Sequence, residues 1–203
     1  MSKTITAAFL LRSAGWVLIA ALALYAGRGA LAATPTAAYT ELNKPWTVDP
    51  GGKIEVVEFF WYGCPHCYSL EPTVQSWLGA LPKDVEFRRI PAPPNESWKA
   101  AARTYYALDA LGVLTRLHKP LFDAVQLDHL RLTNTQQVDD WLTRQNVDVA
   151  RFHAAENSFS VETKLKRAAQ LFDQSEAGGV PAMVVNGRYL VELSKSTTPQ
   201  KIS

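Results

Sequence analysis

Five segments of the chain have the residue pattern of β-strands. Residues 53–61 are rich in β-branched and aromatic side chains, typical of a central strand, and residues 85–90 alternate between polar and apolar positions. Residues 182–185 and 188–193 flank Asn186-Gly187, which is a strong signal for a β-hairpin. Residues 39–42 complete the set as a short edge strand that ends before Pro45.

Apolar residues that recur every three or four positions predict six helices. The first runs from Pro65 or His66 to Leu78, and we expect Pro72 to bend or break it near Leu70. Four more follow between residues 95 and 157, the second of them disturbed by Pro120, and the last spans residues 159–176. The N-caps expected within the four-helix stretch are Asn95 or Ser97, Thr135 and Asp148.

The first 32 residues have the pattern of a secretory signal peptide. Lys3 and Arg12 precede residues 13–27, which carry no charge and are mostly apolar, and small residues follow up to Ala32. The uncharged stretch is shorter than the roughly 20 residues that a membrane-spanning helix needs. We therefore predict cleavage after Ala32 and no retained anchor.

Removal of this segment changes the charge of the chain. The 203 residues carry a formal charge of +2, from 21 basic and 19 acidic residues. Three of the basic residues and none of the acidic ones lie in residues 1–32, which leaves 18 against 19 and a net charge of −1. The sequence thus gives no support for nucleic acid as a partner. In an oxidising compartment outside the cytosol, a disulfide can form and persist.

The only two cysteines, Cys64 and Cys67, lie at the predicted start of the first helix. Unpaired N–H groups and the helix dipole at that position favour a thiolate, which lowers the pKa of Cys64. Cys67 lies one turn later, within disulfide reach and more buried. We expect an exposed Cys64 to exchange disulfides and Cys67 to resolve the mixed disulfide. His66, when protonated, adds positive charge near Cys64, and Pro65 restricts the backbone.

A metal site is the rival interpretation of a Cys-x-x-Cys pair. A structural zinc site needs four ligands, and the chain has no second cysteine pair. The remaining histidines lack ligand spacing, so no metal and no diffusible cofactor is expected. A two-thiolate copper carrier stays open as a non-enzymatic alternative. These remaining histidines are His118, His129 and His153.

Two separated motifs resemble the DsbA family of periplasmic thiol:disulfide oxidoreductases. The first is Glu58-Phe59-Phe60 followed by Cys64-Pro65-His66-Cys67-Tyr68 and Glu71. The second is Gly179-Val180-Pro181-Ala182-Met183 with Asn186-Gly187, and Tyr39-Thr40 and Lys44-Pro45 also match. The resemblance covers residues 39–192. It implies an α/β thioredoxin fold with an inserted α-helical domain.

The residue pattern and the resemblance together divide the chain into five parts. After the signal peptide (1–32) come the first part of the thioredoxin-like domain (33–94), the helical insertion (95–157) and the second part of the thioredoxin-like domain (158–193). A polar tail (194–203) ends the chain. The family usually has a further helix after the hairpin, but the polar residues after Leu193 predict that it is missing here. We expect this to lower stability or to cause self-association through an uncovered sheet face.

The resemblance assigns roles to residues outside the cysteine pair. It implies a cis peptide bond before Pro181, packed against the cysteines, where the loop at Val180 binds an extended substrate peptide. Valine before the proline is similar to the oxidases of the superfamily. Glu58 is implied to be a buried acid that assists proton transfer at Cys67, with Arg89 as its possible charge partner. From the residues alone, a solvent-facing Glu58 is the alternative, and the Val180–Pro181 peptide bond could equally be trans.

Other residues near the predicted site are given weaker expectations. Glu71 is expected to form a local salt bridge or to lie on the surface. Five aromatic residues are candidates either for the core or for an apolar surface that holds unfolded substrates. They are Trp61, Tyr62, Trp98, Tyr105 and Tyr106.

Together these patterns predict an exported, monomeric dithiol oxidase of the periplasm. It would donate the Cys64–Cys67 disulfide to reduced, unfolded exported proteins through a mixed disulfide on Cys64. A quinone-linked membrane reoxidase of DsbB type would restore the disulfide, as the resemblance implies. The alternatives are a thioredoxin-type dithiol reductant or isomerase, and the copper carrier.

Overall fold

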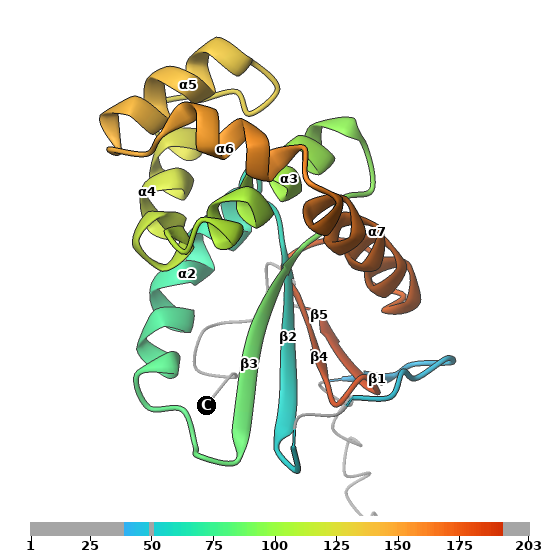
Figure 1. Ribbon diagram of the computed structural model, residues 1–203. Coiled ribbons are helices and arrows are strands. Elements are labelled where there is room, and N and C mark those ends of the chain that lie inside the picture. Colours follow the sequence, from blue (N-terminus) through green and yellow to red (C-terminus); the bar gives the residue numbers. More distant parts are fainter. Residues whose placement is uncertain (1–38, 49–50, 193–203) are drawn as a thin grey trace, which may run out of the picture. The chain divides into compact units, whose positions relative to one another are not determined.

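The structure is a computed structural model that describes residues 39–48 and 51–192 (Figure 1). The predicted signal peptide and the predicted lack of a final helix after Leu193 lie outside the described residues. No helix in the described ranges is long and apolar enough to cross a membrane.

A five-stranded mixed sheet has the order β1-β5-β4-β2-β3. The central strand β2 (Ile54–Phe60) is buried from its second residue onward and pairs in parallel with β3 (Val85–Pro91). On its other side β2 pairs antiparallel with β4 (Ala182–Val185), which forms a hairpin with β5 (Tyr189–Glu192). The short β1 (Thr40–Glu41) lies at the edge. All five predicted strands are confirmed.

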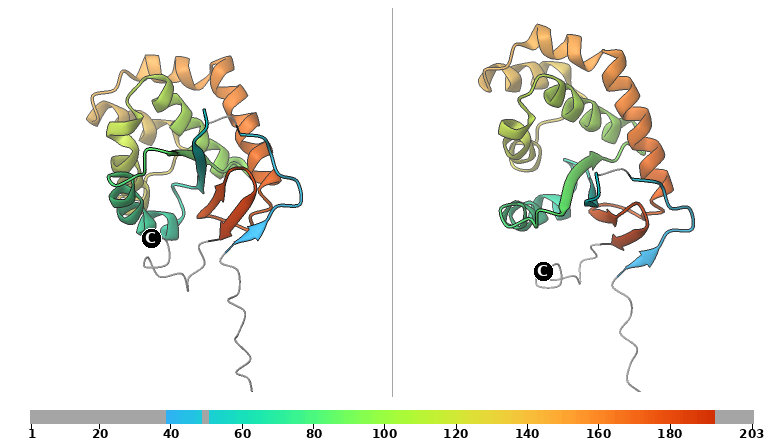
Figure 2. Two further views of the ribbon diagram at one scale, coloured as in Figure 1. Left: turned by 90° about the horizontal axis from the view of Figure 1, so that it is seen from below. Right: turned by 60° about the horizontal axis from the view of Figure 1, so that its bottom comes forward.

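Helices cover both faces of this sheet (Figures 1 and 2). On one face Val56 and Met183 pack with Val74 of α2 (Pro65–Leu78). On the other face Phe59 meets Phe172 of α7 (Phe159–Gln174), with ring centroids 5.5 Å apart. The alternation of side chains along β2 thus directs one set toward α2 and the other toward α7.

Four helices separate β3 from α7 and gather beyond the end of the sheet where β2 ends (Figure 1). Asn95 and Asp148 are N-caps as expected, but Asn134 and not Thr135 caps the third of these helices. The four helices are α3 (Glu96–Ala110), α4 (Leu114–Gln126), α5 (Thr135–Arg144) and α6 (Val149–Glu156).

Two prolines lie inside continuous helices, although the sequence predicts a disturbance at each. α2 runs unbroken through Pro72, and α4 runs through Pro120 to Gln126. An internal proline costs a helix about 3 kcal/mol. Buried side chains on both sides of each proline, such as Cys67 and Val74 in α2, hold the helix against the core and outweigh that cost.

The hairpin turn fixes the position of β4. Asn186 and Gly187 both have positive φ, at 49° and 61°, as a tight hairpin requires. The Asn186 N–H donates to Glu55 O at 2.8 Å, and the Asn186 side chain accepts from the Glu55 N–H at 2.9 Å. The turn therefore anchors the hairpin to the start of β2.

Candidate active site

The two cysteines lie where β2 ends and α2 begins. Cys64 is the N-cap of α2, and its Sγ accepts a hydrogen bond from the Cys67 N–H at 3.4 Å. Pro65 follows as the first helical residue, where its missing N–H is not needed. The predicted placement of the pair at a helix start is confirmed.

This placement drives the pKa values of the two thiols in opposite directions. The pKa of Cys64 falls from an ordinary value of 9.0 to about 6, chiefly because the Cys67 side chain hydrogen-bonds to it. Backbone N–H groups of Cys67 and His66 and the charge of His66 add to this effect, while burial opposes it. Burial, and then the proximity of Cys64, raise the pKa of Cys67. The thiolate of the dithiol form is therefore on Cys64.

Both cysteines are nearly covered. Cys67 is 1% exposed and Cys64 is 7% exposed. The expectation of an exposed Cys64 is therefore wrong for this dithiol form, although Cys64 is still the more accessible thiol. The position of Cys64 at a helix start would leave its thiol at the surface, but neighbouring residues cover it.

The second motif meets the first at this point. The Val180–Pro181 peptide bond is cis, as the resemblance implies, and Val180 O lies 3.4 Å from Cys64 Sγ, which can donate to it in its thiol form. β4 begins at the next residue, and its pairing of Ala182 with Phe59 on β2 brings this loop to the cysteines.

Glu58 lies on β2 within the core, at 1% exposure. The alternative in which it faces solvent is therefore wrong. Arg89 of β3 is its partner as expected, with Arg89 Nε donating to Glu58 Oε2 at 3.0 Å. Burial raises the pKa of Glu58 from 4.5 to about 7, since it outweighs the lowering effect of Arg89, and the nearby Glu71 raises it further.

Glu71 of α2 is also buried, at 1% exposure, so the surface alternative is wrong and the salt bridge is confirmed. Arg89 Nη2 lies 3.1 Å from each carboxylate oxygen of Glu71, and Gln75 Nε2 donates to Oε1 at 2.6 Å. Burial alone would raise the pKa of Glu71. The combined effects of His118, Arg89 and Gln75 outweigh it and lower that pKa.

His118, for which the sequence predicts no role in this site, lies beside this carboxylate. His118 of α4 is buried, with Nδ1 2.8 Å from Tyr62 Oη and Nε2 3.6 Å from Glu71 Oε2. No motif or spacing signals this contact, because His118 and Glu71 lie on different helices whose packing is a tertiary property.

The aromatic candidates divide into two groups. Trp61 and Trp98 are partly exposed and stack on each other, with ring centroids 4.4 Å apart and an interplanar angle of 9°. Tyr62, Tyr105 and Tyr106 are buried, so the structure contradicts a substrate-facing role for these three. Of these five aromatic candidates, Trp61 and Trp98 remain available for contact with a substrate.

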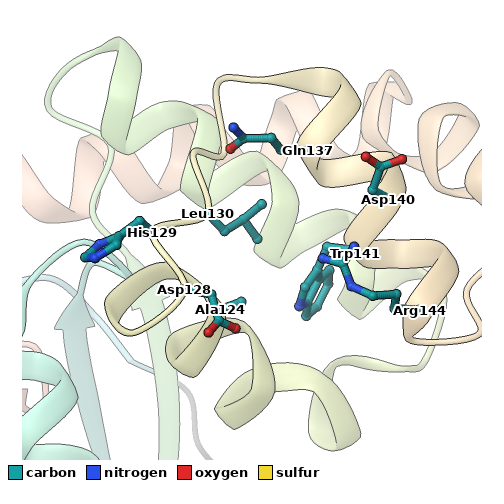
Figure 3. Close-up of a pocket in the computed structure, with 8 residues that line it drawn as sticks. All are labelled: Ala124, Asp128, His129, Leu130, Gln137, Asp140, Trp141 and Arg144. Atoms are coloured by element: carbon teal, nitrogen blue, oxygen red, sulfur yellow. The ribbon is translucent and has the colours of Figure 1, made fainter.

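A hollow of about 200 Å³ in the helical region gives no sign of a metal centre (Figure 3). It lies between α4 and α5, and its His129 points away from Asp140. Within residues 39–48 and 51–192, no group of three or more His, Cys, Asp or Glu side chains could hold a metal ion.

Comparison with known proteins places this site in a family. Residues 83–199 match the model of the DSBA-like thioredoxin domain. The chain is 40% identical over 162 residues to the thiol:disulfide interchange protein DsbA of Azotobacter vinelandii, covering 80% of this chain and 76% of that protein. It is 40% identical over 178 residues to that of Pseudomonas syringae pv. tomato, covering 86% and 83%.

Solved structures give the same result. The crystal structure of Pseudomonas aeruginosa DsbA superimposes with a TM-score of 0.75 and 38% identity, covering 81% of this chain and 85% of that chain. The oxidoreductase DsbA from Xylella fastidiosa gives a TM-score of 0.71 and 35% identity, covering 75% and 84%. The chain therefore belongs to the DSBA-like thioredoxin domain family, and it is a protein-disulfide oxidoreductase.

Proposed function

We propose that the chain is an exported dithiol oxidase that donates the Cys64–Cys67 disulfide to reduced proteins through a mixed disulfide on Cys64. The observation that supports this best is the opposite shift of the two thiol pKa values, with Cys64 at about 6 and Cys67 raised. A dithiol form that holds a stable thiolate is favoured over the disulfide, which makes the disulfide a strong oxidant.

The reaction takes two exchanges. A substrate thiolate attacks Cys64 Sγ, the Cys64–Cys67 bond breaks, and Cys67 leaves as a thiolate that takes up a proton. A second substrate thiolate then attacks the substrate sulfur of the mixed disulfide, and Cys64 leaves as a thiolate. Two electrons pass from the substrate thiols to the cysteine pair. The low pKa of Cys64 makes it a good leaving group in the second exchange.

Glu58 supplies the proton for the first exchange. A thiolate on Cys67 is costly because the residue is buried, and the charge of Glu58 acts on it. With a pKa of about 7, Glu58 is about half protonated at neutral pH and can act as donor in one direction and acceptor in the other.

Substrate binding uses the loop at Val180 and Pro181. Val180 O lies beside Cys64 Sγ, so a peptide that passes this loop as an added strand brings its own cysteine to the reacting sulfur. The partly exposed Trp61–Trp98 stack offers apolar contact area for an unfolded chain. Pro65 and His66 between the cysteines shape and charge the helix start.

The cellular setting follows from the predicted signal peptide. We propose that the protein works as a monomer in the periplasm on reduced exported proteins. A quinone-linked membrane reoxidase of DsbB type would return the pair to the disulfide. The relatives share the name of thiol:disulfide interchange protein, which supports exchange with protein thiols.

The test is the redox equilibrium of the pair against glutathione, together with a titration of Cys64 by its ultraviolet thiolate absorbance. We expect a titration midpoint near 6 and a pair more oxidising than glutathione. An unshifted thiol pKa with a strongly reducing potential would defeat the oxidase proposal and favour a reductant. Stoichiometric copper binding without thiol oxidation would favour the carrier.

A further inference from the structure

His118 is a buried ionisable group that the exchange reaction above does not use. Its side chain is 7% exposed and packs among aromatic rings, with Phe60 and Phe122 at centroid distances of 5.3 and 5.2 Å. Among the described residues, Nε2 has no hydrogen-bond partner, since Glu71 Oε2 is at 3.6 Å. A buried polar atom of this kind calls for an explanation.

The contacts of the ring determine which nitrogen carries the proton. Burial lowers the pKa of His118, so the imidazole is neutral and has one N–H. Burial raises the pKa of Tyr62, so its hydroxyl keeps its proton and can donate to Nδ1 at 2.8 Å. The nitrogen Nε2 faces Glu71 Oε2, and an ionised carboxylate can only accept, so the imidazole proton is favoured on Nε2 with Tyr62 as the donor to Nδ1.

Glu71 in turn shares one guanidinium with the proton donor. Arg89 contacts Glu58 through Nε at 3.0 Å and Glu71 through Nη2 at 3.1 Å. The two carboxylates compete for the same cation, and each is 1% exposed, so water cannot substitute for it. A further hydrogen-bond donor directed at the Glu71 carboxylate would therefore change how strongly Arg89 pairs with Glu58.

We propose that His118 is a positioning residue for disulfide exchange. It directs Nε2–H at Glu71 and so leaves Arg89 free to hold Glu58, the proton donor to Cys67. The inference rests on the proposed function, because it takes Glu58 as that donor. The ionisable groups that face this cluster come from five elements: Glu58 of β2, Tyr62 of the turn, Cys67 and Glu71 of α2, Arg89 of β3 and Tyr105 of α3.

The direction of the effect follows from the geometry. Without the imidazole, Glu71 keeps only Arg89 and Gln75 as partners and draws the guanidinium toward itself. Glu58 then loses part of the positive charge that stabilises its ionised form, so its pKa rises.

Two substitutions of similar polarity distinguish the contributions of the two imidazole nitrogens, Nδ1 and Nε2. His118→Asn places an amide group where Nδ1 lies and keeps the contact with Tyr62, but it does not reach Glu71. His118→Gln extends an amide nitrogen to the position of Nε2 and keeps a donor directed at Glu71. Both side chains are neutral and remove the aromatic ring, so a role of the ring in packing alone would be lost in both variants.

The readout is the pH profile of disulfide transfer to a peptide whose thiol is ionised over the whole range. In the native protein we expect the rate to fall as the pH rises through about 7, where Glu58 loses its proton. His118→Asn should move this midpoint upward by about half a pH unit or more, and His118→Gln should leave it in place. The thiolate titration of Cys64, which His118 does not affect, should stay near 6 in both.

Equal profiles for the native protein and His118→Asn, at an unchanged Cys64 titration, would overturn the inference. If His118→Asn does not fold, Tyr62→Phe is the alternative variant. Without the Tyr62 hydroxyl, the imidazole proton is free to move to Nδ1, so the midpoint of the pH profile should again move upward. The role of Glu58 fails separately: if Glu58→Gln retains the native pH profile, Glu58 is not the donor, whatever His118 does. The oxidase function itself fails only in the redox equilibrium against glutathione and the Cys64 titration, which do not depend on His118.

Discussion

Cys64 and Cys67 are one helical turn apart, yet their surroundings differ in kind. Cys64 Sγ meets the N–H groups of a helix start, whereas Cys67 lies in the core beside a buried carboxylate. The same chain segment thus provides a good leaving group and a poor one. The poor one needs a proton, which gives Glu58 its proposed role.

Replacement of that acid tests the role directly. Glu58→Gln should slow disulfide transfer at pH 6–7 by about tenfold or more and remove its dependence on pH in this range, because the amide cannot donate a carboxyl proton. Stopped-flow transfer to a thiol peptide measures this. The matched control is Glu55→Gln on the same strand, since Glu55 pairs with Arg88 at 2.7 Å but points to the other face of the sheet. An equal loss in both variants would contradict the role.

Individual site residues could be predicted from the sequence only where they belong to a recognisable motif. It identified the cysteine pair, the loop at Pro181 and the pairing of Glu58 with Arg89. It missed His118, because nothing local distinguishes a histidine that meets a carboxylate from one that simply fills a core. It also left Trp61 and Tyr62 undivided, although these neighbours face surface and core respectively.

Among the elements, the turn that joins β2 to α2 leaves no room for a side chain at Gly63. A Cβ placed at Gly63 would overlap the ring of Trp61, which stacks on Trp98. The glycine is therefore needed for the tryptophan to lie flat across the turn next to Cys64. The stack, in turn, joins this turn to the first helix of the helical region.

Gly63→Ala should displace Trp61 from the stack and destabilise the fold by about 1–3 kcal/mol. Tryptophan fluorescence reports the displacement, and urea unfolding reports the stability. Gly79→Ala, at the other end of α2, is the control, because its Cβ meets nothing closer than Ser76 O at 3.3 Å and its φ of −66° suits alanine. If Gly63→Ala left both measurements unchanged, the packing argument would be wrong.

The bounds of helices and strands were largely predictable because periodicity and caps are local signals. The end of α2 at Leu78 and the caps at Asn95 and Asp148 follow from such signals. The continuity of helices through Pro72 and Pro120 was not predictable, since it depends on burial against other elements. Helix propensity includes the free-energy cost of an internal proline, but it does not include the tertiary packing that outweighs this cost.

Over the whole molecule, the thiolate couples redox state to stability. The folded pKa of Cys64 lies below its ordinary value, so the folded dithiol form binds fewer protons than the unfolded chain between about pH 6 and pH 9. Stability from this source is complete above pH 9 and is lost as the pH falls through about 6. Glu58 acts in the opposite sense, since its raised pKa makes stability fall as the pH rises from 4.5 to about 7.

A pH series of urea unfolding separates these terms. Relative to Cys64→Ser, the dithiol form should gain on the order of 4 kcal/mol between pH 6 and pH 9, because Glu58 is common to both proteins. A constant difference across the series would show that Cys64 titrates normally in the folded chain, and it would count against the thiolate as the source of oxidising power.

The contact between Val180 and Cys64 has a consequence for the order in which the protein matures. Thiolate stabilisation needs only the first turn of α2, a short-range structure that forms early. The peptide-binding loop needs β4 to pair with β2 across more than a hundred intervening residues, which is slow. We therefore expect a newly made chain to be chemically reactive before it is selective, because completion of the sheet adds the peptide-binding loop to a thiol that is already reactive.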